Sequence, residues 1–181
     1  RTGTDRFDVI SCDPADLFVS GMANLYTRES HRLVRNRMAE GGAFVQYLHA
    51  YHLNASDLCG LLATTLSVFP HTSVWVQPHG DFLVLATDQP LRIDPAAWER
   101  RLRASGAGAD LERAGITPAS DIAGLFLWDA ADLARYAANA RLVTDADPFT
   151  EFTISRVPFT RAGQNRLGRD CAMAFRLPRR L

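Results

Sequence analysis

Hydrophobic residues near the start of the chain recur first at the spacing of a strand and then at that of a helix, twice in succession. Short apolar runs at Phe7–Cys12 and Ala43–Leu48 predict two strands. Helical spacing over Thr27–Met38 and Asn54–Phe69 predicts two helices, the first ended by the glycines of Glu40–Gly42. The order strand, helix, strand, helix is typical of an α/β fold.

A second pair of strands follows. Thr72–Gln77 and Asp81–Thr87 are joined by three residues, so short a connection that the two strands must be antiparallel neighbours. A hairpin therefore ends the sheet. Beyond Asp94 the chain is rich in Ala, Arg and Leu, and we expect four short helices there: Pro95–Ala104, Ala109–Ala114, Asp121–Trp128 and Ala131–Ala138. The last segment, Leu142–Leu181, contains strand-like pieces such as FTISRV.

Composition places the chain among ordinary globular domains. Its 181 residues are 47% hydrophobic and 22% charged, enough for one buried core. Twenty acidic residues balance twenty basic ones, so no net field attracts nucleic acid or a membrane surface, and we expect neither as a partner. Every basic residue is Arg, which excludes chemistry that needs a Schiff-base lysine.

Cysteine and histidine spacing argues against a metal site. Cys12, Cys59 and Cys171 are odd in number and far apart, which indicates neither a disulfide framework nor a zinc site and suits a reducing cytoplasm. We therefore expect a cytoplasmic protein. Four histidines could suggest a metal site: His49, His52, His71 and His79. No carboxylate pattern with ligand spacing accompanies them, so we predict no metal. No apolar run reaches the roughly 18 residues of a membrane span.

Two carboxylates follow the first strand at the end where open α/β sheets place their chemistry, Asp13 and Asp16. Either could instead cap the turn and bind nearby amides. Tyr26 and Tyr47 could line a pocket there, or pack in the core or at its rim. Gln46, at the end of the second strand, could bind a ligand or serve only its own loop.

The segments FDVISCDPADLF, NLYTRE and GGAFVQY together resemble the polyamine aminopropyltransferases, the spermidine and spermine synthases. The family pattern is an apolar strand, Asp-x-x-Asp, a loop, then Leu-Tyr and a helix. The chain is most similar to bacterial spermidine synthase-like proteins, some of which carry a membrane-spanning part ahead of the catalytic domain. Further resemblance lies in VFPHTSVWV, GDFLVLATD and TDADPFTEF.

This resemblance implies the C-terminal half of a Rossmann-like, methyltransferase-type sheet, strands 4 to 7, with the last hairpin antiparallel. On that basis we expect residues 1–93 to form this half-domain, 94–140 a helical appendage and 141–181 a C-terminal segment with short strands. The glycine motif and the acidic ribose-binding residue of the family have no counterpart here, so no cofactor-binding residue is assigned. We expect the chain alone to be inactive.

The activity implied by the resemblance is transfer of an aminopropyl group from decarboxylated S-adenosylmethionine, a co-substrate, to a diamine such as putrescine, with no tightly bound cofactor. Asp13 would be the general base, Asp16 would grip the ammonium groups, and Tyr26 would help to wall the site. Gln46 and Tyr47 are further candidates for substrate binding. The chemistry is consistent, because an amine with a pKa of about 10 must lose a proton to a placed base before it can attack.

Two alternatives remain open. The same fold could carry an S-adenosylmethionine-dependent methyltransferase. The chain could also be a non-catalytic interaction module, in which Asp13 and Asp16 act only structurally. If no strand precedes it in the sheet, Phe7–Cys12 is an unpaired apolar edge, which natural proteins rarely leave open. We therefore predict a homo-oligomer, or pairing of this strand with a partner or with the chain's own tail.

Overall fold

The computed structural model describes residues 3–14, 17, 19–49, 53–77, 81–116 and 122–154. Asp16, one of the two candidate site carboxylates, lies outside the described residues, as do His52, His79 and the segment 155–181 with Cys171.

Five strands form one sheet in the order β1-β2-β4-β3-β5. Their bounds are β1 Phe7–Cys12, β2 Met38–Leu48, β3 His71–Val76, β4 Phe82–Thr87 and β5 Phe126–Trp128. β1 and β2 are parallel, whereas β4 runs antiparallel to both β2 and β3, and β5 runs antiparallel to β3. The α/β class, the four strands expected before residue 90 and the antiparallel hairpin are thus confirmed. A parallel pair of strands followed by an antiparallel hairpin thus accounts for four of the five strands.

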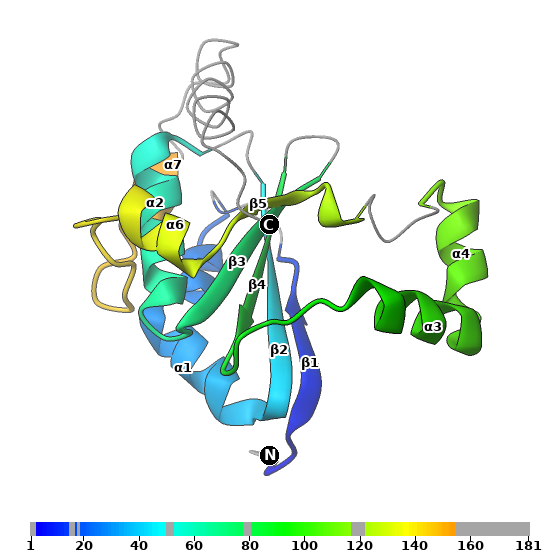
Figure 1. The fold of residues 1–181 in the computed structure, drawn as a ribbon. Coiled ribbons are helices and arrows are strands. Elements are labelled where there is room, and N and C mark those ends of the chain that lie inside the picture. The colour runs from blue at the N-terminus through cyan, green and yellow to red at the C-terminus, as the bar shows by residue number, and fades with distance from the viewer. Residues whose placement is uncertain are drawn as a thin grey trace.

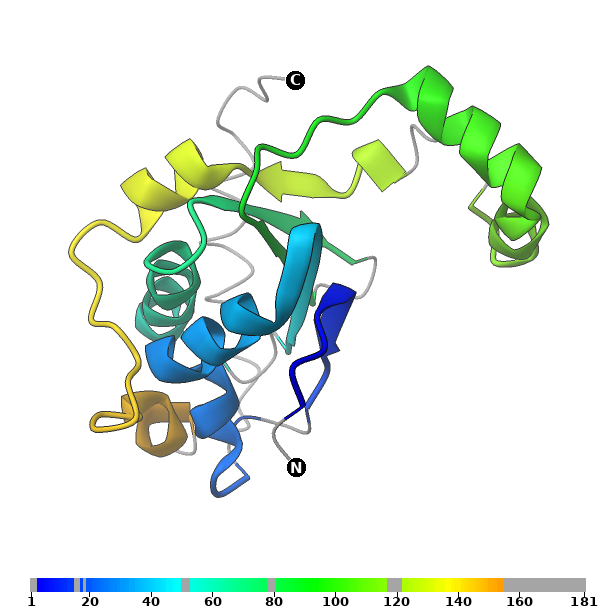
Figure 2. The ribbon, with the colours of Figure 1, turned by 90° about the horizontal axis from the view of Figure 1, so that it is seen from below.

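Helices cover one face of this sheet. They are α1 Arg28–Arg37, α2 Ala55–Leu66, α6 Ala130–Tyr136 and α7 Phe149–Ile154, with a 3-10 helix, η1, at Met22–Tyr26. Figures 1 and 2 show α1, α2 and α6 together on one side of the strands. Two further helices, α3 Pro95–Ser105 and α4 Ala107–Arg113, extend away from the sheet on the other side.

The buried core lies between the sheet and these covering helices. Val74 and Val84 pack in one cluster with Leu58 and Leu62 of α2, which are fully buried. Phe44 packs with Phe69 in a second cluster. The opposite face of the sheet carries the alternate residues of the same strands, which are half-buried or exposed. Three of the four strand pairs are antiparallel, and antiparallel sheets commonly pack one face on the core and leave the other accessible.

The glycines expected to end the first helix lie instead inside a strand. α1 ends at Arg37 and β2 begins at once with Met38. The pairing of β1 with β2 shifts register around Gly41 and Gly42, and Gly41 has a φ of 72°. A Cβ at Gly42 would lie 3.0 Å from the Phe7 carbonyl oxygen. The glycines therefore allow the two backbones to approach at a bulge, which the reading as a helix C-terminus missed.

Two other expectations were wrong. The helix expected over Asp121–Trp128 gives way at Phe126–Trp128 to β5, which extends the sheet at β3. Trp128 then stacks on Tyr136 of α6, with ring centroids 4.7 Å apart. The strand expected at FTISRV begins inside α7, a helix, and its remainder falls outside the described residues. The division into parts at residues 93 and 140 stays a prediction.

Candidate functional site

Parallel pairing brings the carboxyl ends of β1 and β2 to the same edge of the sheet. Cys12, the last residue of β1, lies opposite Gln46 of β2. Asp13 follows directly and is exposed, beside the end of β2 at Tyr47. The structure thus places Asp13 where the first strand ends, at the edge where α/β sheets hold their reactive groups.

A second carboxylate, Asp81, lies at the same edge. β4 pairs with β2 so that Leu48 lies opposite Phe82, and Asp81 immediately precedes that pair. The Tyr47 hydroxyl donates a hydrogen bond of 2.6 Å to Asp81 Oδ2. This bond, together with desolvation and the negative charges of Asp81 and Asp13, raises the pKa of Tyr47 to about 12. Tyr47 is therefore a neutral hydrogen-bond donor to Asp81, close enough to Asp13 to be affected by its charge.

Tyr26, the expected wall of the site, is buried beneath this edge. Its side chain is 1% exposed and packs in the main core with Leu48 and Leu53. Its hydroxyl donates a hydrogen bond of 2.9 Å to the carbonyl oxygen of Tyr47. Tyr26 thereby fixes the end of β2 from the core side. Whether it also contacts a substrate stays a prediction.

Gln46 faces the core as well, and both ends of its amide are occupied. Its Nε2 donates to the Leu25 carbonyl oxygen at 3.2 Å, which turns Oε1 towards His31 Nε2, 3.1 Å away. His31 must then carry its proton on Nε2. Burial among Phe44 and Phe69 lowers the pKa of His31 to about 4 and keeps the ring neutral. The role of Gln46 in substrate binding, too, stays a prediction.

Burial also affects the residue next to Asp13. Desolvation, and to a smaller extent the negative charge of Asp13, raises the pKa of the Cys12 thiol, while a contact with Gln46 lowers it. A raised pKa keeps the sulfur in its less nucleophilic thiol form. Asp13 therefore has no thiolate competitor at this strand end.

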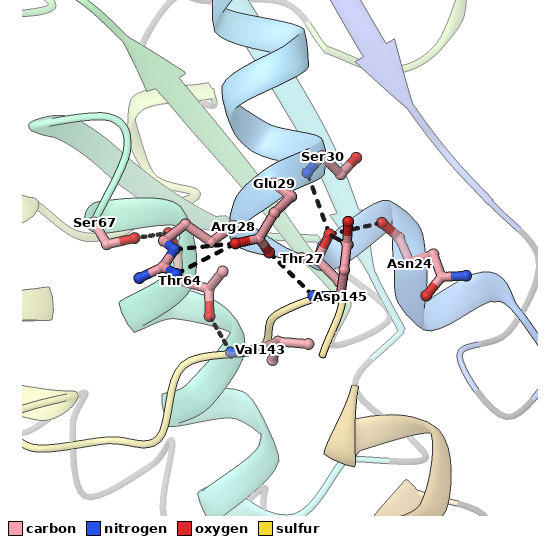
Figure 3. Close-up of polar contacts among 9 residues, drawn as sticks. All are labelled: Asn24, Thr27, Arg28, Glu29, Ser30, Thr64, Ser67, Val143 and Asp145. Atoms are coloured by element: carbon pink, nitrogen blue, oxygen red, sulfur yellow. Dashed lines mark hydrogen bonds and ion pairs between the residues drawn. The ribbon is translucent and has the colours of Figure 1, made fainter. Parts of the chain in front are cut away.

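The start of α1 is tied to a distant segment of the chain at this same end of the sheet (Figure 3). The Thr27 hydroxyl oxygen caps the helix by accepting from Ser30 N at 3.2 Å, and it donates to Asp145 Oδ1 at 2.6 Å. The backbone N–H of Asp145 donates in turn to Glu29 Oε2 at 3.0 Å, and this bond lowers the pKa of Glu29. The carboxylates of Glu29 and Asp145 thus hold the chain together here.

The same segment is attached to α2 as well. Val143 N donates to Thr64 Oγ1 at 2.8 Å, and the Val143 carbonyl accepts from Arg28 N at 2.9 Å. Thr64 donates its own hydroxyl proton to the Gly60 carbonyl within α2. Figure 3 shows the bond between Val143 and Thr64 of α2. The helices under the candidate site are therefore locked to each other by a buried backbone contact.

The structure brings together Asp13 and Tyr47 among the candidates from sequence, and adds Asp81. Sequence reasoning missed Asp81, although one signal was present. Because β4 pairs with β2 in the antiparallel direction, the residue just before β4 lies next to the end of β2. Within the described residues, no group of three or more His, Cys, Asp or Glu side chains is arranged to hold a metal ion. In the same part of the chain, no helix has the length and apolar character needed to span a bilayer.

Comparison with known proteins gives one kind of similarity. No model of a protein family matches the chain, and no curated protein matches it. Among solved structures, it is similar to one described as a probable spermidine synthase from Corynebacterium glutamicum, with 19% sequence identity and a TM-score of 0.47. The similarity covers 76% of this chain and 47% of that one, so the chain spans about half the length of that protein.

Proposed function

We propose that this chain provides the amine-binding side of an aminopropyltransferase that uses decarboxylated S-adenosylmethionine and a diamine such as putrescine. The observation that carries the proposal is the exposed Asp13 at the end of β1, next to the hydrogen-bonded pair of Tyr47 and Asp81. Two carboxylates beside the carboxyl ends of the neighbouring strands β1 and β2 suit a substrate with two ammonium groups. The resemblance of the segments around Asp13, Tyr26 and Tyr47 to the family pattern supports the same reading.

In this proposal Asp13 accepts the proton of the attacking amine. The amine nitrogen forms a bond to the carbon attached to the sulfonium, the carbon–sulfur bond breaks, and its electron pair stays on sulfur in the neutral thioether product. Placement of the amine against that carbon would supply several kcal/mol of the rate enhancement. Asp81 would hold the distal ammonium group, in addition to the role that the family pattern gives Asp16. Tyr47 would keep the Asp81 carboxylate in position.

Tyr26 and Gln46 would act on this site through the backbone. Both hold the strand and loop around Tyr47 from the core side, by way of the Tyr47 and Leu25 carbonyl oxygens. No described residue is assigned to the adenosine part of the co-substrate. The function proposed for the described residues is thus recognition and deprotonation of the amine. A cytoplasmic location is part of the proposal.

Calorimetric titration with putrescine tests the amine site directly. Removing one carboxylate that contacts an ammonium group should weaken binding about tenfold, because a hydrogen bond to a charged group contributes roughly 1.5–3 kcal/mol. We expect this loss for Asp13→Asn and for Asp81→Asn. Asp8→Asn is the matched control, since Asp8 is an exposed aspartate of the same strand, at its other end. Equal affinity of all four proteins would refute the amine site.

The chemistry needs a separate assay. Because this chain alone is expected to be inactive, the assay uses a protein in which the chain is joined to a part that binds the adenosine group. In that protein, transfer of a radiolabelled aminopropyl group to putrescine should be measured beside transfer of a labelled methyl group from S-adenosylmethionine. Under the proposal, only the aminopropyl group is transferred, and Asp13→Asn abolishes that transfer. Methyl transfer alone would establish the methyltransferase alternative instead.

A second candidate, an interaction module, is favoured by the free edge of β1. The edge away from β2 pairs with no strand among the described residues. Phe7 and Val9 on this strand are 51% and 63% exposed. We infer that β1 is covered by self-association. Sedimentation equilibrium should show a dimer or larger species that Val9→Arg dissociates, and a strictly monomeric wild-type protein would contradict the inference.

A further inference from the structure

A pocket of about 530 Å³ lies on the face of the sheet that the core helices leave open. Its floor is apolar and comes from three neighbouring strands. Val45 of β2 lies opposite Leu85 of β4, and Leu83 of β4 lies opposite Trp75 of β3. These four side chains line the pocket. Cross-strand partners share a face, so the floor is one continuous hydrophobic surface.

The pocket has a wall of apolar side chains from the segment that leaves the sheet. Leu91 and Ile93 line it from the connection between β4 and α3, and Trp98 lines it from α3. Leu91 and Ile93 are 48% and 44% exposed, although each lies against this hydrophobic floor. Ile122 and Leu125 line the pocket as well. The pocket is therefore a concave apolar groove, which we call the open-face groove.

Two guanidinium groups, Arg92 and Arg101, also line the open-face groove. Among the described residues, neither has a carboxylate partner, whereas Arg103 on the same helix as Arg101 pairs with Glu99. Asp94 is the one acidic side chain in the lining that the structure describes. Its carboxylate caps α3 by accepting from two backbone N–H groups at 3.0 and 3.1 Å.

The charges at the far end of the same face have the opposite sign. Side chains alternate along a strand, so Asp81 shares the face of Leu83 and Leu85, as Tyr47 shares that of Val45. Asp13 lies beside Tyr47. An anion in the groove would therefore be repelled from the carboxylate end and attracted to Arg92 and Arg101.

We propose that the open-face groove binds a small amphipathic anion, a free aliphatic carboxylate whose chain lies on the strand floor and whose head group meets Arg92 and Arg101. The volume of the groove falls in the range of small-molecule sites, about 300–1,000 Å³. The planar guanidinium group matches a carboxylate with two parallel hydrogen bonds. The site is independent of the amine site proposed above, because it uses different side chains and selects the opposite charge.

Titration with three ligands of equal chain length tests this proposal on the full chain. The ligands are decanoate, decan-1-ol and decyltrimethylammonium, each kept below its micelle-forming concentration and followed by tryptophan fluorescence and calorimetry. Decanoate should bind at least about tenfold more tightly than the other two, since a hydrogen bond to a charged group corresponds to at least that factor. Equal affinity for all three head groups would overturn the proposal.

The double variant Arg92→Ala with Arg101→Ala should lose this preference for decanoate, while Arg103→Ala should keep it. All three arginines are exposed, so none of these changes empties a packed site. Loss of the preference in Arg103→Ala to the same extent would refute the assignment of the head-group site. Two further outcomes would refute the proposal. The first is a dimer in which Trp98 is protected from a soluble quencher and to which decanoate does not bind. The second is a protein that binds vesicles containing decanoate but not free decanoate.

Discussion

The buried His31 should make the stability of this protein fall as the solution is acidified. Desolvation is the main cause that lowers its pKa from 6.5 to about 4, against the opposing effect of its contacts with Gln46 and the Thr64 backbone. Its Nδ1 has no hydrogen-bond partner that meets normal geometry among the described residues. Protonation would therefore place an unpaired charge between two phenylalanine rings.

The sign and size follow from linkage between proton binding and folding. The unfolded chain takes up a proton on His31 near pH 6.5, whereas the folded chain resists until about pH 4, so the folded state loses stability as pH falls through this window. Each pH unit between the two values corresponds to about 1.4 kcal/mol. The full loss is about 3 kcal/mol, and about 2 kcal/mol of it appears by pH 5.

Urea unfolding at pH 7.5, 6 and 5 measures this loss. His31→Leu should be less stable at pH 7.5, because Gln46 Oε1 loses its donor, but its stability should change with pH by about 2 kcal/mol less than that of the wild type. Val74→Ala is the control, since it empties part of the core and leaves the histidine in place. If His31→Leu and Val74→Ala have the same pH dependence, the reasoning about His31 is wrong.

Three further predictions concern packing and hydrogen bonding. Gly60→Ala should destabilise the protein by about 1–3 kcal/mol in thermal or urea unfolding, because a Cβ there would lie 2.7 Å from Phe149 Cζ. Gly108→Ala, in the exposed helix α4, is the control and should cost little. Equal effects of the two changes would contradict this prediction. Thr64→Val should cost about 1–3 kcal/mol, since the buried N–H of Val143 loses its acceptor, and an unchanged urea midpoint would count against the bond. Tyr47 should stay protonated at pH 11 in NMR spectra of ring-labelled tyrosine, and Asp81→Asn should lower its pKa; ionisation by pH 10 in the wild type would refute the bond.

Sequence reasoning succeeded where the hydrophobic pattern was long and regular, and failed where it was short. The strands over β1 to β4 and the helices α1 and α2 have clear periods, and each was found. Phe126–Trp128 belongs to a brief apolar run that suits either element. Pairing with the exposed edge of β3 decides it in favour of a strand. α7 was missed because its threonines and isoleucine favour strands, while Phe149 packs on Gly60 as part of a helix.

Strand parity explains which candidate residues can meet a ligand. Phe44, Gln46 and Leu48 point into the core, whereas Val45 and Tyr47 point to the open face. The sequence alone could not assign these faces, because a sheet covered on both sides would bury both sets. Gln46 lies on the core side, where it bonds the Leu25 carbonyl oxygen and His31. Under the proposed function, direct contact with the amine is assigned to Asp13, at the strand end, and to the side chains that share a face with Tyr47.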